Sequence, residues 1–336
     1  MNRLSSHSAV AALVVPAALA AAALAVAGAA PASASAASTP VVTDVHTVVA
    51  FDYAAGQQPE NVTVNPDRSL TVSQLGFLNG QPPELLRISP SGQQAVLVTG
   101  LAGEAIGGNA RGSDGSIYYN LLSADPARSG IWRLPPGGAP ERIAAIPGAF
   151  LNGLTIDPAT QTLYSADSLA ATIWSVPASG GTATKWLVSQ ALAPAQSGPG
   201  HFGVNGVTFQ QGAVWASNTD KGTLLRVPVT STGAPGLVQL VAGNLPGIDD
   251  FKFLSTCTSI AFVALNSQDK VAVVYPDGHS RVVLTAADGL ASPTDTAIRG
   301  TRLYITDGGD VAPHDSKLQE ARINLAALLD PAAETQ

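Results

Sequence analysis

The chain has 336 residues and a net charge of −7, with 17 basic against 24 acidic side chains. An acidic protein without clusters of basic residues is a poor nucleic-acid binder, so this class of partner is excluded. Charged residues make up 12% of the chain, whereas 33 glycines and 24 prolines supply many turns, a mixture typical of an all-β protein with short strands.

The N-terminus has the pattern of a secretory signal peptide. Arg3 precedes an apolar run over residues 9–27, and small residues with A-x-A spacing follow at 32–36. The run is long enough for the alternative of a membrane-spanning helix, but Pro16 and the excess of Ala over Leu favour cleavage. We therefore expect a leader at 1–36, a flexible lead-in at 37–43, one folded region at 44–330, and a secreted protein.

A short pattern recurs along the rest of the chain. One oxygen-bearing side chain stands two residues before an apolar-x-apolar alternation, which predicts a strand. Clear copies begin at Glu60, Asn152, Asn205 and Asp249, and weaker copies begin at Gly108 and Thr294. The intervals are 44 to 53 residues, and each unit has room for four short strands separated by Pro and Gly turns.

Four strands repeated at this period predict a six-bladed β-propeller with four-stranded antiparallel blades. The last unit is short, and the otherwise unassigned strand at 45–51 can supply its outer strand, which would close the ring. A pair of β-sandwiches or a solenoid would not explain why a polar position recurs at the head of each unit. In a propeller these heads meet at one mouth of the central channel.

The four clear positions predict a metal site, with Glu60, Asn152, Asn205 and Asp249 as ligands. Two carboxylates and two amides are hard oxygen donors, which suit Ca²⁺ better than Mg²⁺ or Zn²⁺, although another divalent metal stays open. The alternative is that each residue only forms the turn before a strand.

On these residues the chain resembles the calcium-dependent six-bladed propellers of the regucalcin and gluconolactonase family, to which diisopropylfluorophosphatase is structurally related. The resemblance spans residues 45–325 and rests on the order Glu60, Asn152-Gly153, Asn205-Gly206 and Asp249. It implies metal-assisted hydrolysis of a small lactone or ester, with Asp249 as the catalytic residue, acting as a base for water or as a nucleophile. The family commonly has Pro-Asp-Gly in the fifth blade, and the motif here leaves both Asp249 and Asp250 open.

Further substrate contacts are expected from Asn152 and His201. The resemblance also implies a substrate-binding arginine between the first and second blades, for which Arg111 is the candidate. Cys257 is either a nucleophile or, as favoured, a small buried side chain. We expect a monomer with a small-molecule substrate. Two other functions stay open: a non-catalytic propeller that binds a ligand or partner around a structural metal, and a metal-free propeller similar to the alkaloid synthases.

Overall fold

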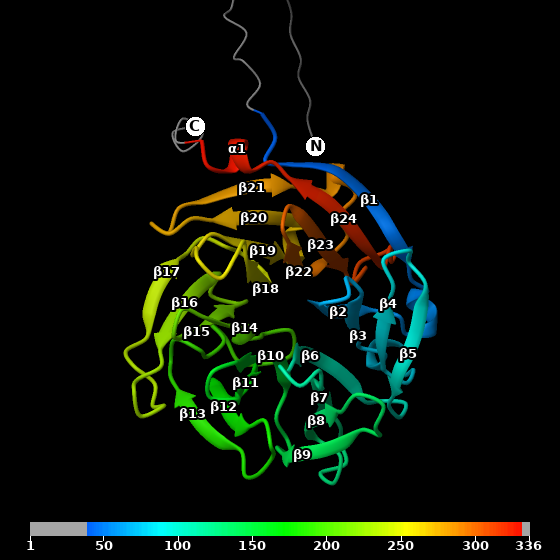
Figure 1. Cartoon of the computed structure of the whole chain (residues 1–336), viewed down its shortest axis with the longest axis vertical. Coiled ribbons are helices and arrows are strands. Elements are labelled where there is room, and N and C mark those ends of the chain that lie inside the picture. Colours follow the sequence, from blue (N-terminus) through cyan, green and yellow to red (C-terminus); the bar gives the residue numbers. More distant parts are fainter. Residues whose placement is uncertain (1–38, 331–336) are drawn as a thin grey trace, which may run out of the picture. The chain divides into compact units, whose positions relative to one another are not determined.

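The computed structural model describes residues 39–330, which form one folded unit of 24 strands arranged as six four-stranded antiparallel sheets. The predicted leader and the first part of the lead-in lie outside the described residues. Figure 1 shows the sheets as six blades around a common centre, with β2, β6, β10, β14, β18 and β22 innermost. The predicted six-bladed propeller is confirmed.

The first three blades follow each other along the chain from the inner strand outward. The first contains β2 (Pro59–Val64), β3 (Leu70–Gln74), β4 (Glu84–Ile88) and β5 (Gln94–Thr99). The second contains β6 (Ala105–Arg111), β7 (Ile117–Leu122), β8 (Gly130–Leu134) and β9 (Glu141–Ala145). The third contains β10 (Leu151–Asp157), β11 (Thr162–Asp167), β12 (Thr172–Pro177) and β13 (Thr184–Val188).

The remaining blades follow the same order until the last. The fourth contains β14 (Val204–Gln210), β15 (Ala213–Asn218), β16 (Thr223–Pro228) and β17 (Gln239–Ala242). The fifth contains β18 (Ile248–Phe253), β19 (Ala261–Leu265), β20 (Lys270–Val274) and β21 (Ser280–Leu284). The sixth contains β22 (Pro293–Arg299), β23 (Arg302–Asp307), β24 (Lys317–Ile323) and the N-terminal β1 (Val42–Ala50).

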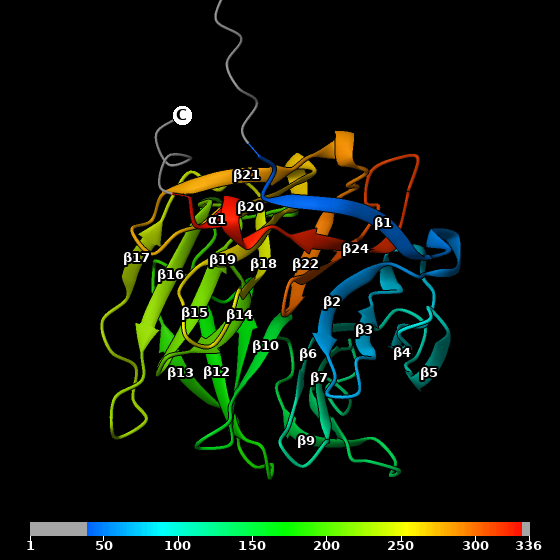
Figure 2. The ribbon, with the colours of Figure 1, turned by 45° about the horizontal axis from the view of Figure 1, so that its top comes forward.

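The ring is closed by the two ends of the folded region. β1 pairs antiparallel with β24, from Val42 opposite Ile323 to Ala50 opposite Lys317, and Figure 2 shows the two strands side by side. The predicted outer strand at 45–51 is therefore present, and it begins earlier, at Val42. Because β24 gains a partner from the other end of the chain, the last blade has the same four strands as the others.

Helices contribute little. The described helices are η1 (Tyr53–Ala55), η2 (Phe77–Asn79), η3 (Asn266–Gln268), η4 (Ala286–Asp288) and α1 (Leu325–Leu328). In residues 39–330, no helix has the length and apolar character needed to cross a membrane. Cys257 lies in the loop between β18 and β19 and is exposed, so the expectation that it is buried is wrong.

The apolar core is divided into six clusters, and each lies between neighbouring blades. Leu85 of the first blade packs with Tyr119 of the second, and Phe262 of the fifth packs with Ile305 of the sixth. The seam is filled in the same way, since Val49 packs with Val72 of the first blade. Hydrophobic burial therefore holds blade against blade and leaves the axis to polar side chains.

The inner strands approach each other closely where glycine follows a polar residue. A Cβ atom on Gly153 would lie 2.6 Å from both Asn205 O and Val207 N of the next blade. A Cβ on Gly206 would lie 2.5 Å from Asp250 Oδ1. The Asn-Gly pairs of the third and fourth blades thus combine a polar group with the space that the narrow hub requires.

We predict that Gly153→Ala destabilises the fold by about 2 kcal/mol, because the added methyl group overpacks a contact between two backbones. The matched control is Gly243→Ala, since a Cβ there would meet nothing within 4 Å and Gly243 does not have a positive φ. Urea unfolding followed by circular dichroism measures both. Equal stability of the two variants would contradict the close approach of β10 and β14.

Candidate functional site

Each inner strand contains a β-bulge at its leading end, and the recurring polar residues lie in it. The pairing with the second strand shifts between Pro59 and Val62 in β2 and between Ile248 and Phe251 in β18. A bulge places an extra residue on one strand and leaves its backbone without the regular partner. Both bulged residues can then face the hub, which is why Asp249 and Asp250 have separate roles there.

Hydroxyl groups of the second strand support three of these bulges. Ser73 Oγ accepts a hydrogen bond from Asn61 N at 3.1 Å, and Ser217 Oγ accepts one from Gly206 N at 2.8 Å. Thr306 Oγ1 accepts one from Asp295 N at 3.0 Å. Three buried side chains at corresponding positions thus hold the backbone beside the polar residues.

A cavity of about 370 Å³ opens at the end of the hub where these bulges lie. The four predicted ligands, Glu60, Asn152, Asn205 and Asp249, all line it. Gly107 takes the corresponding position in the second blade, one residue before the predicted Gly108. Thr294, the predicted start of the sixth unit, also lines the cavity, together with polar residues that the recurring pattern does not include, namely Tyr53, Thr219, Asn266 and Asp310.

Asp310 is the main addition to the predicted set. It lies in the loop between β23 and β24, is exposed at the cavity mouth, and accepts a hydrogen bond from Asn266 Nδ2 at 3.1 Å. The residue stands three positions after the end of β23, outside the repeated pattern. The signal available in the sequence was the turn Asp307-Gly308-Gly309, which ends the strand and leads into Asp310.

The structure places neither Arg111 nor His201 in the cavity lining. Arg111 ends β6, four residues beyond the cavity-lining Gly107, and donates from Nη1 to Asn65 Oδ1 at 3.2 Å. Because a strand rises about 3.3 Å per residue, Arg111 lies well down the channel from the end where the cavity opens. His201 Nδ1 lies 2.9 Å from Asp220 Oδ2, and its neighbour Phe202 lines the cavity in its place.

The cavity floor has oxygen atoms without partners. Within residues 39–330, no hydrogen bond or ion pair reaches the carboxylates of Glu60 and Asp249 or the side-chain amide of Asn152. Asn205 Nδ2 donates to Thr219 Oγ1 at 2.9 Å, which leaves Asn205 Oδ1 buried and unpaired. A floor of unpaired carboxylate and amide oxygens is short of positive charge.

The pKa values of the two carboxylates also reflect the lack of positive charge at the cavity floor. Burial, followed by the negative charges of Asp310, Asp250 and Asp295, raises the pKa of Glu60 to about 8. Burial and then the charge of Glu60 raise the pKa of Asp249 well above its usual range. Each carboxylate therefore favours a proton or a cation beside it.

The donor set fits a hard divalent cation. Two carboxylates would balance the charge of Ca²⁺, and the two amide oxygens match its preference for oxygen ligands in irregular geometry. In the part of the chain from 39 to 330, no three His, Cys, Asp or Glu side chains are close enough to form a metal cluster by themselves. The fit therefore depends on the amides of Asn152 and Asn205.

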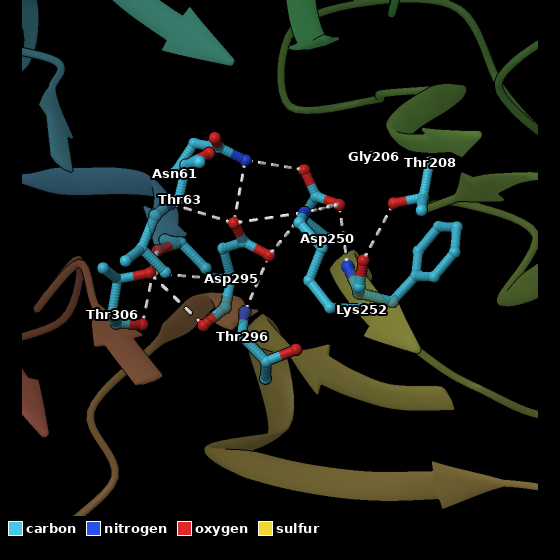
Figure 3. A network of polar contacts seen from close by, with 12 residues as sticks. Asn61, Thr63, Gly206, Thr208, Asp250, Lys252, Asp295, Thr296 and Thr306 are labelled. Carbon is cyan, nitrogen blue, oxygen red and sulfur yellow. Dashed lines mark hydrogen bonds and ion pairs between the residues drawn. The ribbon is translucent and has the colours of Figure 1, made fainter. Parts of the chain in front are cut away.

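A buried network lies directly under this floor, and Figure 3 shows it. Asn61 Nδ2 donates to Asp250 Oδ2 at 3.0 Å and to Asp295 Oδ2 at 2.8 Å. Lys252 Nζ donates to Asp250 Oδ1 at 3.2 Å and to Asp295 Oδ1 at 3.1 Å. Burial raises the pKa of Asp295 to about 7 although Lys252 lowers it. The network holds Asn61 and Asp250, which are adjacent in sequence to Glu60 and Asp249.

The network also separates the two candidate aspartates. Asp250 is 4% exposed and is bound by Asn61 and Lys252, whereas Asp249 lines the cavity. Asp249 is therefore the residue available to a cation or substrate, and Asp250 supports the floor from below.

Solved structures show the same fold at low sequence identity. Regucalcin from Agrobacterium tumefaciens, described as a calcium-binding protein, matches with a TM-score of 0.61 and 18% identity over 84% of this chain and 94% of its own. A candidate gluconolactonase matches with a TM-score of 0.62 and 16% identity, over 85% and 94% of the two chains. An auxiliary nutrient binding protein from Bacteroides ovatus matches with a TM-score of 0.66 and 11% identity, over 85% and 78%.

These likenesses confirm the expected resemblance in fold. No protein-family model matches the chain, and no curated protein matches it in sequence. The residues of the cavity are thus the basis for any functional assignment.

We predict that Lys252→Met lowers the free energy of unfolding by about 3 kcal/mol, because it leaves Asp250 and Asp295 without their cation. Lys270→Met is the control, since Lys270 has no ion pair among the described residues. Chemical unfolding at pH 8 measures both variants. A midpoint for Lys252→Met equal to that of wild type would show that the ion pairs do not support the hub.

Proposed function

We propose that the protein is a divalent-cation-dependent hydrolase of lactones or related esters, with Ca²⁺ as the preferred cation. One observation carries the proposal: Glu60, Asn152, Asn205 and Asp249 line one cavity, and Asn205 Oδ1 is buried there without a hydrogen-bond partner. The presence of regucalcin and a candidate gluconolactonase among the structural neighbours supports it. A bound cation would polarise the carbonyl group of a substrate.

The chain's own residues would supply the remaining functions. Asn152 and Asn205 present amide oxygens from adjacent bulges, and Glu60 faces them from the first blade. Asp249 orients the attacking water and accepts its proton. The water oxygen bonds to the carbonyl carbon, the bond from that carbon to the ring or ester oxygen breaks, and the proton passes to the departing alkoxide.

One feature favours the second candidate, a propeller that binds a ligand without turning it over. Neither a histidine nor a lysine is among the described residues that line the cavity, so its titratable side chains are carboxylates and the phenol of Tyr53. A nutrient binding protein among the structural neighbours is consistent with this alternative. In that case the cation would organise the cavity floor and hold a ligand oxygen.

We predict that Asp249→Asn lowers kcat/KM for lactones and aryl esters by about 100-fold or more, because it removes the proton acceptor. Asp44→Asn is the control, since Asp44 lies in the outermost strand β1 and is exposed. Activity is measured with calcium and with chelator. A calcium-dependent rise in melting temperature without turnover of any substrate would favour the binding protein. The absence of any calcium effect would favour a metal-free propeller.

We predict that calcium stabilises the protein more at pH 8.5 than at pH 6. The pKa of Glu60 is raised to about 8 from an ordinary 4.5, so the folded state without cation binds an extra proton between these values. Raising the pH through this window removes that proton and destabilises the folded state, whereas a bound cation replaces it.

The measurement is the difference in melting temperature between calcium and chelator at the two pH values. This difference should widen with pH in wild type and change less in Glu60→Gln. A difference that narrows as the pH rises would contradict the assignment of Glu60 as a cation ligand.

A further inference from the structure

The cavity has walls of a different character from its floor. Above the acidic floor it is lined by Leu75, Phe77, Leu122, Phe150 and Phe202, and the rings of Phe150 and Phe202 lie 5.3 Å apart. These side chains come from loops and strand ends of the first four blades. A polar ligand such as a sugar lactone would place its hydroxyl groups against hydrocarbon and lose their hydrogen bonds with water.

A second hollow of about 270 Å³ continues this wall outward. It shares Phe77, Leu122 and Phe150 with the cavity and extends to Leu169, which is 55% exposed in the loop between β11 and β12. No charged side chain among the described residues lines this hollow, and Ser123 is its one hydroxyl-bearing residue. The two hollows thus form an apolar groove that leads from the acidic floor to the surface.

We propose that this groove is an acyl-chain subsite, and that the substrates are lactones or esters carrying an unbranched alkyl chain. The inference rests on the proposed function, because it places the carbonyl group at the floor and the chain along Phe150, Leu122 and Leu169. The wall removes each methylene group from water, so affinity rises with chain length. Within residues 39–330, no arginine or lysine lines the cavity to pair with a substrate carboxylate, since Arg111 lies elsewhere.

The test is a series of γ-lactones whose alkyl substituent grows from none to eight carbons, assayed with the calcium-loaded protein. In wild type, kcat/KM should rise about fourfold for each added methylene until the groove is filled. Leu169→Glu should flatten this slope, because it places a charge where the chain lies. Leu237→Glu is the matched control, since Leu237 is 86% exposed, lies between β16 and β17, and lines neither hollow.

A binding arm separates this inference from the hydrolytic function. Non-hydrolysable γ-lactams with the same alkyl chains are titrated by calorimetry into wild type and Leu169→Glu. Affinity that rises with chain length in wild type and not in Leu169→Glu supports the subsite, even where no lactone is turned over and the hydrolase proposal fails. Equal affinity along the series, or a preference for a hydroxylated sugar lactone, overturns the subsite, and measurable lactone turnover would then leave the hydrolase proposal standing.

Discussion

The structure depends on how the negative charge at its hub is balanced. Five carboxylates converge there, those of Glu60, Asp249, Asp250, Asp295 and Asp310. Three of them are nearly inaccessible to solvent, since Asp249 is 8%, Asp250 4% and Asp295 0% exposed. Lys252 is the one cationic side chain that the described residues place in contact with them. Two unit charges 4 Å apart repel by about 4 kcal/mol at the effective dielectric constant of a protein surface. Lys252 offsets one of the two charges of the lower pair, Asp250 and Asp295, whereas no cationic side chain among the described residues contacts the upper pair, Glu60 and Asp249. The upper pair is therefore stabilised by protons or by a cation.

The propeller can hold this charge at its hub because the hydrophobic contacts that stabilise the fold lie between the blades. The six apolar clusters lie between blades, and the pairing of β1 with β24 completes the circle at the seam. Closure fixes the inner strands at separations that leave no room for a Cβ atom at Gly108, Gly153 or Gly206. The acidic groups therefore cannot move apart to relieve their repulsion, and under the proposed function they would serve as a preformed set of ligands for a cation.

The sequence predicted the blade number, the ring closure and the residues that share a cavity, because a fixed period of strands determines which positions face the axis. It did not decide whether Asp249 or Asp250 is the ligand, because strict strand alternation lets only one of two adjacent side chains face the hub. The bulge between Ile248 and Phe251 lets both face it. The pairing of Asp250 with Lys252 could have been noticed as two charges on one strand face. The position of Asp295 opposite them comes from another blade and requires coordinates. Asp310, Cys257 and His201 lie in loops, where no period constrains the chain.

The two parts of the cavity have different origins, which affects how its specificity arises. The oxygen floor belongs to bulges of the inner strands, where the glycines, the supporting hydroxyl groups and Lys252 all restrict substitution. The apolar wall belongs largely to loops and strand ends, as with Phe77 in η2 and Leu169 after β11, where side chains can change without disturbing a blade. The inner strands of the closed ring would determine the reaction chemistry, and the loops would determine which substrates are accepted. Propellers with the same floor can therefore differ widely in the molecules they accept.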